Sequence, residues 1–133
     1  MNHGDVTEAI IGCAMKVHRT LGPGFLEVVY RNALAYELGK LERGVECERA
    51  IEVMYEGVSV GLFFADMLVD GVVLVENKAV QTLNRSHEVQ LVNYLTATGI
   101  DVGLLLNFGA PRLEYKRKSR VLQVMGFEDP DAE

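Results

Sequence analysis

Apolar residues at helical spacing predict two helices in the first third of the chain. Behind Asp5, which resembles the start of a capping box, apolar residues recur every three or four positions and predict a helix over 6–20. Glycine and proline at 22–24 interrupt this pattern. A second apolar stripe begins at Leu26 and ends at Gly44, a residue type common just after a helix, so a second helix is predicted there.

The period of the pattern changes to two near residue 45. Alternating apolar and charged residues over 45–55 predict a half-exposed strand, and apolar runs over 60–68 and 72–78 predict two more. Turn residues at 56–57 and 70–71 join the three strands into a meander. The last two runs are apolar on both faces, which is typical of strands in the middle of a sheet that helices cover on both sides.

The remaining pattern completes a mixed domain. Ser86 can cap a third helix that runs to about Thr98, where Gly99 stops it. A fourth strand is predicted over 102–107, and 113–118 is a candidate for a fifth. The predicted order is therefore α-α-β-β-β-α-β, an α/β (α+β) domain whose mixed central sheet is flanked by helices.

Length and composition place this pattern in one globular unit. The 133 residues are 49% hydrophobic and 24% charged, which predicts a single domain over 1–127 and a flexible acidic tail over 128–133. Without a long apolar stretch or a basic, apolar leader, we expect a soluble cytoplasmic protein with no membrane partner. Cys13 and Cys47 lack metal-ligand or disulfide spacing, so both are expected to be reduced, packed thiols.

The formal charge of −6 argues against a protein that coats nucleic acid without specificity. Its distribution is uneven, because five of the thirteen basic residues fall within nine positions that hold one acid. These five are Arg112, Lys116, Arg117, Lys118 and Arg120. They would present a basic edge to a polyanion, but an ordinary solvated face is the commoner explanation of such a cluster.

Asp66, Glu76 and Lys78 interrupt the two apolar strands, where an uncompensated charge is costly. Alternation places Glu76 and Lys78 on one face. In a hairpin, the residue numbers of any two paired positions add up to the same constant. Asp66 shares a face with Glu76 only if this sum is even, which requires a loop with an odd number of residues. A three-residue loop over 69–71, with Gly71 left-handed, meets this condition, whereas a two-residue loop would turn Asp66 to the other face. The sequence leaves both loops open.

Two carboxylates and one ammonium on one face would suit a divalent cation. Magnesium takes a few carboxylate oxygens together with waters and phosphate oxygens, and a metal beside a lysine is what phosphodiester hydrolysis requires. The alternative is a buried Lys78–Glu76 ion pair with Asp66 at an edge. These three residues alone do not choose between the two interpretations.

Longer motifs resemble a known family. Asp66 followed after ten residues by Glu76-Asn77-Lys78 resembles the D…ExK signature of the PD-(D/E)XK nuclease superfamily. The segment GFLEVVY over 24–30, preceded by VHRTLG, is a literal GxxExxY and resembles the motif of the GxxExxY family within that superfamily. LNFG over 106–109 and LEYKR over 113–117 are similar to that family's C-terminal block. The resemblance extends over 10–120.

The resemblance implies a restriction-endonuclease-like core and a metal site on the central hairpin. Asp66, Glu76 and the backbone carbonyl of Asn77 would hold Mg²⁺ or Mn²⁺, and Lys78 would be catalytic. Glu27, at the start of the second predicted helix, would match the family's helical acid that reaches the metal. Without the resemblance, Glu27 is equally an acid that stabilises the positive end of the helix dipole.

Other matched positions complete the predicted site. Gln90 would be the polar catalytic position on the third helix, with Tyr94 one turn later on the same face. Two residues depart from the family pattern. Ala65 stands where the founding signature has proline, and Asn77 stands where a large aliphatic residue is usual, on the face opposite Lys78.

The implied function is Mg²⁺-dependent hydrolysis of nucleic acid, with DNA favoured by analogy with the family. The implied nucleic-acid contacts are Arg85, His87 and Tyr94 together with the basic residues of 112–120; free N–H groups at a helix start favour phosphate near His87. The alternative is a non-catalytic nucleic-acid-binding or protein-binding module on the same fold. Relatives on this fold are often dimers or parts of larger complexes, so self-association is expected.

Overall fold

A computed structural model describes residues 2–120 of the chain. The elements in this range are α1 (Gly4–Leu21), α2 (Glu27–Lys40), β1 (Val45–Tyr55), β2 (Val58–Val69), β3 (Val73–Lys78), α3 (Arg85–Thr98), β4 (Val102–Asn107) and β5 (Glu114–Ser119). The predicted order is confirmed, and the candidate fifth strand is present as β5. The predicted tail over 128–133 lies outside the described residues.

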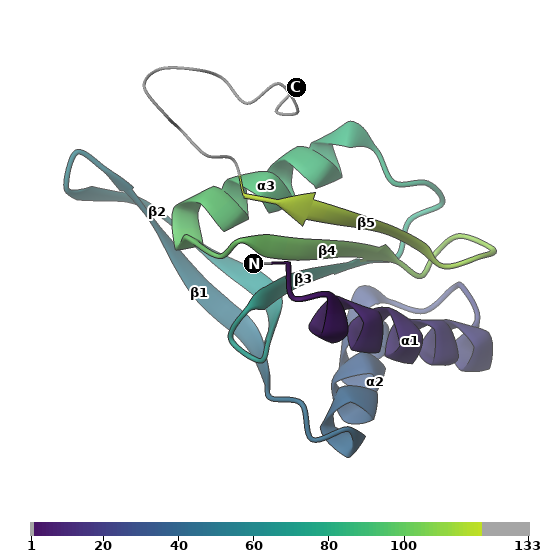
Figure 1. The fold of residues 1–133 in the computed structure, drawn as a ribbon. Coiled ribbons are helices and arrows are strands. Elements are labelled where there is room, and N and C mark those ends of the chain that lie inside the picture. The colour runs from purple at the N-terminus through teal and green to yellow at the C-terminus, as the bar shows by residue number, and fades with distance from the viewer. Residues whose placement is uncertain (1, 121–133) are drawn as a thin grey trace.

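The strands form one mixed sheet in the order β1-β2-β3-β4-β5. Antiparallel pairing joins β1 to β2, β2 to β3 and β4 to β5, whereas β3 and β4 are parallel. Parallel neighbours require a crossover connection, which α3 supplies. The sheet thereby acquires a helix on the face opposite the two N-terminal helices (Figure 1).

Each face of the sheet has its own core, and strand alternation assigns side chains to them. Val73 and Val75 of β3 pack in the core formed with α1 and α2, whereas Leu74 between them packs with α3. The same division holds in β4, where Leu104 faces the first core and Leu105 the second. Consecutive apolar residues therefore indicate strands that are buried from both sides, as predicted for β3 and also found in β4.

Tyr30 fixes the connection between α1 and α2. Its ring is fully buried and stacks on Phe108, with ring centroids 4.7 Å apart. Its hydroxyl donates to the carbonyl of Gly22 at 2.5 Å and accepts from the amide of Phe25 at 3.1 Å. The tyrosine of the GxxExxY segment thus ties the loop to the core and positions the first turn of α2, where Glu27 lies.

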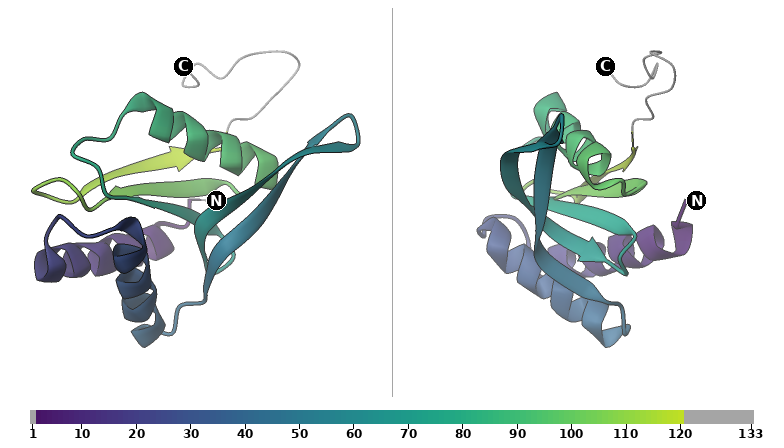
Figure 2. Two further views of the ribbon diagram at one scale, coloured as in Figure 1. Left: turned by 180° about the vertical axis from the view of Figure 1, so that it is seen from behind. Right: turned by 90° about the vertical axis from the view of Figure 1, so that its left-hand side faces the viewer.

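The hairpin of β1 and β2 is much longer than its contact with the rest of the sheet. β1 and β2 pair along almost their whole length, but β2 pairs with β3 only at Met67, Leu68 and Val69. The outer part therefore projects from the body as a two-stranded arm (Figures 1 and 2). The expectation that helices cover all of β2 is wrong for residues 58–64, because an apolar strand pattern does not reveal what buries it.

Two predicted helix ends at the N-terminal half are corrected. The residue preceding α1 is His3, which makes no side-chain capping bond, and Asp5 lies within the first helical turn. Helix α2 ends at Lys40 and not at Gly44. The amide of Gly44 instead donates to Asp70 Oδ1 at 2.8 Å, so it joins the start of β1 to the β2–β3 turn.

The cap of α3 is Asn84 rather than Ser86. Asn84 accepts from the amide of His87, and His87 Nδ1 accepts from the amide of Asn84, a reciprocal capping box. Gly99 ends the helix in the left-handed conformation, as predicted. Cys47 is exposed, contrary to expectation, whereas Cys13 is buried. No helix in the described range 2–120 has the length and apolar character needed to cross a membrane.

Candidate functional site

The β2–β3 turn sets the register of the candidate site. Val69 pairs with Val73 and encloses three residues, of which Asp70 and Gly71 have positive φ angles of 53° and 70°. The predicted odd loop is confirmed, although it starts one residue later than expected. Paired positions have an even index sum, as in Met67 opposite Val75.

Regular β2–β3 pairing stops one position before the two acids. The pair after Met67 and Val75 would be Asp66 and Glu76, but here the strands separate. The amide of Asp66 donates to Glu76 Oε2 at 2.7 Å, so a side-chain carboxylate bridges the opening strands. The two acids predicted from D…ExK therefore lie opposite each other at the point where the ladder ends.

Asn77 anchors the carboxylate of Asp66. Its backbone amide donates to Asp66 Oδ2 at 3.1 Å and its side-chain Nδ2 donates to the same oxygen at 2.5 Å. Asn77 Oδ1 is buried without a hydrogen-bond partner among the described residues. An aliphatic residue at this position would provide only the backbone bond. Asparagine in place of an aliphatic residue at position 77 thus gives Asp66 a second hydrogen-bond donor.

Strand β2 twists sharply at Asp66. Ala65 packs in the core with α3, whereas Met67 packs in the core with α1 and α2, although residues two apart normally share a face. Opposite Asp66, Glu48 of β1 has a left-handed φ of 54°, and these two residues are left out of the β1–β2 ladder between the Cys47–Met67 and Arg49–Ala65 pairs, with no change of register. At the same point β2 leaves β3, and a pocket lies beside Asp66.

Arg31 is a charged residue of this pocket that sequence reasoning missed. Its Nη1 lies 3.2 Å from Glu48 Oε1 and 3.7 Å from Asp66 Oδ1, and its buried Nε has no hydrogen-bond partner among the described residues. Arg31 follows Glu27 by four positions and so occupies the same face of α2. That spacing was the available signal, whereas the contact with Glu48 depends on the irregular strand.

The pocket has a volume of about 370 Å³ and lies between α2 and the diverging strands. Its lining residues are Glu27, Arg31, Glu48, Phe64, Ala65, Asp66, Glu76 and Asn77. Exposed side chains, among them Glu27 and Phe64, border it, so the two acids are not sealed beneath hydrocarbon. Groups from both faces of β3 reach this space because it spans the gap between β2 and β3.

The carboxyl group of Glu76 has a strongly raised pKa. Its residue is 8% exposed, and burial raises the pKa to about 7 from an ordinary 4.5. The hydrogen bond from the Asp66 amide and the charge of Lys78 oppose this rise in pKa, whereas the negative charges of Asp66 and Glu27 add to it. A cation placed between the two acids would favour the ionised form of Glu76.

Lys78 ends β3 on the same face as Glu76. It forms no ion pair with any described residue, so the alternative of a buried Lys78–Glu76 pair is not what the structure contains. Its carbonyl accepts from the amide of Phe108 at 2.8 Å. Asn107, paired with Lys78 across the ladder, donates to Glu114 at 2.8 Å and accepts from the amide of Val80, which fixes the chain after the lysine.

The predicted site residues on α3 lie farther from the pocket than expected. These residues are Arg85, His87, Gln90 and Tyr94. Tyr94 contacts Phe63, with ring centroids 5.9 Å apart, and burial followed by the charge of Glu76 raises its pKa, but it does not line the pocket. Gln90 is exposed and does not line the pocket. His87 is engaged in the helix cap, and Arg85 is exposed in the first turn.

Three residues of the predicted basic segment, Lys116, Arg117 and Lys118, lie on β5 at the sheet edge opposite β1, and Arg112 and Arg120 flank this strand. Part of its charge is already compensated: Lys118 lies 2.6 Å from Glu88, and Arg120 lies 2.8 Å from Asp101. Arg117 donates to the carbonyl of Asn2. Arg112 and Lys116 are exposed and have no ion pair with a described residue. The edge is basic, but its residues alternate between the two faces of the sheet.

The donor set fits an open metal site better than a closed one. No group of three His, Cys, Asp or Glu side chains in 2–120 is arranged to enclose a metal ion, although Glu27 lines the same pocket as Asp66 and Glu76. Two acids, one of which has its pKa raised to about 7, together with the unpartnered Asn77 Oδ1, would suit a cation that completes its shell with waters and phosphate oxygens.

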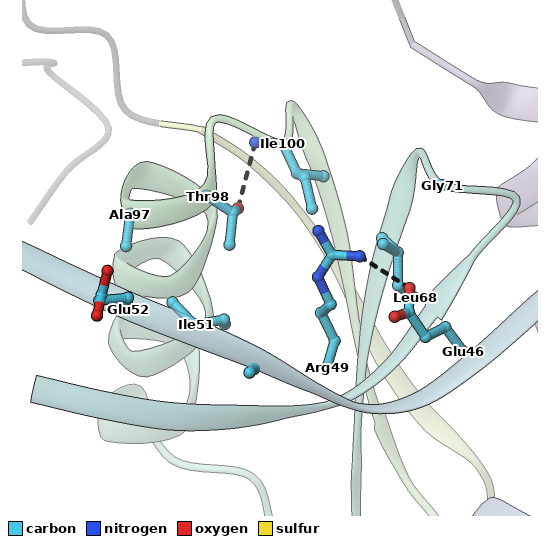
Figure 3. A pocket seen from close by; sticks show the side chains of 10 residues that line it. Glu46, Arg49, Ile51, Glu52, Leu68, Gly71, Ala97, Thr98 and Ile100 are labelled. Atoms are coloured by element: carbon cyan, nitrogen blue, oxygen red, sulfur yellow. Dashed lines mark hydrogen bonds and ion pairs between the residues drawn. The ribbon is translucent and has the colours of Figure 1, made fainter.

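A second hollow of about 380 Å³ lies between β1 and the C-terminal end of α3 (Figure 3). Arg49 and Glu46 form an ion pair at its wall, and Ile51, Leu68 and Ile100 supply apolar surface. None of the sequence-predicted site residues lines it. The candidate site is therefore the pocket beside Asp66.

Comparisons with known proteins place the chain in a superfamily. A family model described as the PD-(D/E)XK nuclease superfamily matches residues 4–118. A solved structure described as "Crystal structure of SSO0001" is similar, with a TM-score of 0.52 and 18% identity, and the match covers 71% of this chain and 50% of that chain. This likeness shows the fold alone, and no significant match was found among curated proteins. With most of its length matched, the chain belongs to the PD-(D/E)XK nuclease superfamily.

Proposed function

We propose that this protein hydrolyses phosphodiester bonds of nucleic acid with a divalent metal ion. The observation that carries the proposal is the position of Asp66 and Glu76, opposite each other in an open pocket where β2 leaves β3. Lys78, unpaired among the described residues, lies two positions after Glu76 on the same face. The GxxExxY segment over 24–30 further favours membership of the GxxExxY family within the superfamily.

Each side chain would have a distinct role. Asp66 and Glu76, with the carbonyl of Asn77, would hold Mg²⁺ or Mn²⁺, which supplies an activated water and neutralises phosphate oxygens. Lys78 would stabilise the negative charge that develops on the phosphoryl group. Glu27, exposed at the start of α2, would orient water at the mouth of the pocket. The second donor of Asn77 holds Asp66 in place before substrate arrives.

Nucleic acid is favoured as substrate by the family and by the basic residues of β5. DNA is favoured over RNA by analogy with the family alone. Arg112 and Lys116 would contact backbone phosphates, while Tyr94 and Arg85 lie on the α3 side of the sheet. Because Lys118 and Arg120 are paired with acids, we expect them to contribute less to the salt dependence of binding.

The test is a cleavage assay on purified protein with Mg²⁺ or Mn²⁺ and single-stranded or duplex DNA and RNA. Lys78→Met and Asp66→Asn should each lower the rate at least about 100-fold, the usual scale for removing a charged stabiliser of the transition state. Lys40→Met, the same kind of change at the end of α2, is the control and should leave the rate unchanged. Equal rates in all four proteins would refute the assignment.

A non-catalytic binding module is the second candidate. Arg31, 3.7 Å from Asp66, is the observation that favours it, because a guanidinium can compensate this acid without any metal. That alternative predicts no heat of Mn²⁺ binding in calorimetry. The nuclease proposal predicts binding that Asp66→Asn abolishes, while Lys78→Met retains it.

A further inference from the structure

The free edge of β2 is an unprotected pairing surface. From Asp66 outward to Val58, β2 has β1 on one side, and no strand within residues 2–120 pairs with its other side. Residues 57–65 read GVSVGLFFA and contain no charged residue. Edge strands are normally guarded by charges, prolines or a covering element. The outer edge of β1 has such charges, at Glu46, Glu48, Arg49 and Glu52, whereas the edge of β2 has none.

The arm, which projects from the body of the domain (Figure 2), also carries many exposed apolar side chains. Seven large apolar side chains on it are 46–64% exposed: Met54, Tyr55, Val58, Val60, Leu62, Phe63 and Phe64. At roughly 200 Å² for each full side chain they present about 800 Å² in total, divided between the two faces of the arm because consecutive strand side chains alternate. A stable protein interface buries about 800 Å² on each partner, so an edge-to-edge contact would use part of this apolar surface together with the backbone of the free edge.

We propose that the free edge of β2 pairs with the same edge of a second copy of this chain, antiparallel about a two-fold axis. The result is a four-stranded ribbon in the order β1-β2-β2-β1 across two subunits. An antiparallel pairing of identical uncharged edges is self-complementary and closes without leaving a further copy of β2 exposed. This assembly does not depend on whether the pocket cleaves nucleic acid.

Charge favours a second copy over a polyanion as the occupant. The arm over 45–65 carries Glu46, Glu48, Glu52 and Glu56 against the single base Arg49, so it would repel phosphates. In the paired ribbon the two β1 strands are the outermost. Three strand spacings, about 14 Å, then separate the like charges, which exceeds the screening length of about 8 Å in physiological salt.

The pairing also reaches the pocket. Phe64 belongs both to the free edge and to the pocket lining, two residues before Asp66. The second copy would therefore border each pocket, and the two pockets would open on either side of one ribbon. A monomer would leave this wall of the pocket to solvent.

The experiment measures the mass of the full chain in solution by light scattering after size exclusion. Wild type should have twice the chain mass of 14.7 kDa. Leu62→Lys and Val60→Lys, at exposed positions of the β2 edge, should each give the monomer mass with unchanged circular dichroism. Ala50→Lys adds the same charge at an exposed position of β1 and is the control, which should remain dimeric.

Hydrogen exchange then distinguishes edge pairing from a contact between faces. The outward amides of β2 over 58–65 should exchange slowly in wild type and quickly in Leu62→Lys. A monomeric wild type, or a Leu62→Lys protein that stays dimeric, would overturn the proposal. A monomeric wild type whose β2 amides are protected by an added single-stranded oligonucleotide would assign the arm to nucleic acid instead, and would also overturn it.

Discussion

Replacing Glu76 by glutamine should change how the stability of the metal-free protein depends on pH. Burial raises the pKa of Glu76 to about 7, so the folded state holds its proton more tightly than the unfolded chain does. The stabilising effect of this proton is complete below about pH 4.5 and is lost as pH rises to about 7. Glu76→Gln cannot ionise, while its carbonyl can still accept the hydrogen bond from the Asp66 amide.

The size of the effect follows from the two pKa values. A carboxyl at about 7 in the folded state and 4.5 in the unfolded state corresponds to about 3 kcal/mol. The free energy of unfolding of Glu76→Gln, relative to wild type, should therefore rise by about 3 kcal/mol between pH 4.5 and pH 8. Other titrating groups are common to both proteins and cancel in this difference.

Urea unfolding followed by circular dichroism in EDTA, at several pH values, measures this difference. Glu88→Gln serves as a control of opposite sign, because the hydrogen bond from Lys118 lowers the pKa of Glu88. That group stabilises the fold at higher pH and loses its effect as pH falls. A Glu76→Gln difference that stays constant with pH would show that the Glu76 carboxylate is well solvated, and the description of the pocket would be wrong.

Three further changes test the packing around the site. Tyr30→Phe should lower the free energy of unfolding by about 1–3 kcal/mol, because the Gly22 carbonyl and Phe25 amide lose their partner; an unchanged urea midpoint would refute this role. Gly109→Ala should be strongly destabilising, since its Cβ would lie 2.5 Å from backbone atoms of Val80. Gly103→Ala, which meets a movable leucine side chain at 2.9 Å, should cost less, and thermal melting that reversed this order would contradict the geometry.

Local chemistry in the sequence predicted the centre of the fold well. Alternation on the 72–78 run placed Glu76 and Lys78 on one face, whereas the Asp70-Gly71 pair was compatible with two loop lengths, and the structure contains the odd one. The features that the sequence did not predict are those that depend on tertiary structure. The apolar run ending at Leu68 looks the same whether helices or a second chain cover it. Arg31 contacts Glu48, whose left-handed backbone conformation is not indicated by any turn motif in the sequence.

The same limit explains the corrected helix ends. Asn84 and Ser86 are both good capping residues, and the choice between them depends on the reciprocal bond with His87. Gly44 has the residue type of a helix stop, but Asp70 captures its amide from across the sheet. Propensity therefore located each boundary within a few residues, while partners distant in sequence decided its place.

The separation of β2 from β3 at Asp66 has two inseparable effects. Had the ladder continued, the backbone would have closed the cavity beside the acids, and the same extra pairs would have shielded the outer strand. The early end of the β2–β3 ladder thus leaves both a pocket beside the acids and an unpaired strand edge. A variant with a longer β2–β3 ladder would close the pocket and cover the edge of β2. The accessibility of the two acids and the exposure of this edge are therefore expected to change together in evolution.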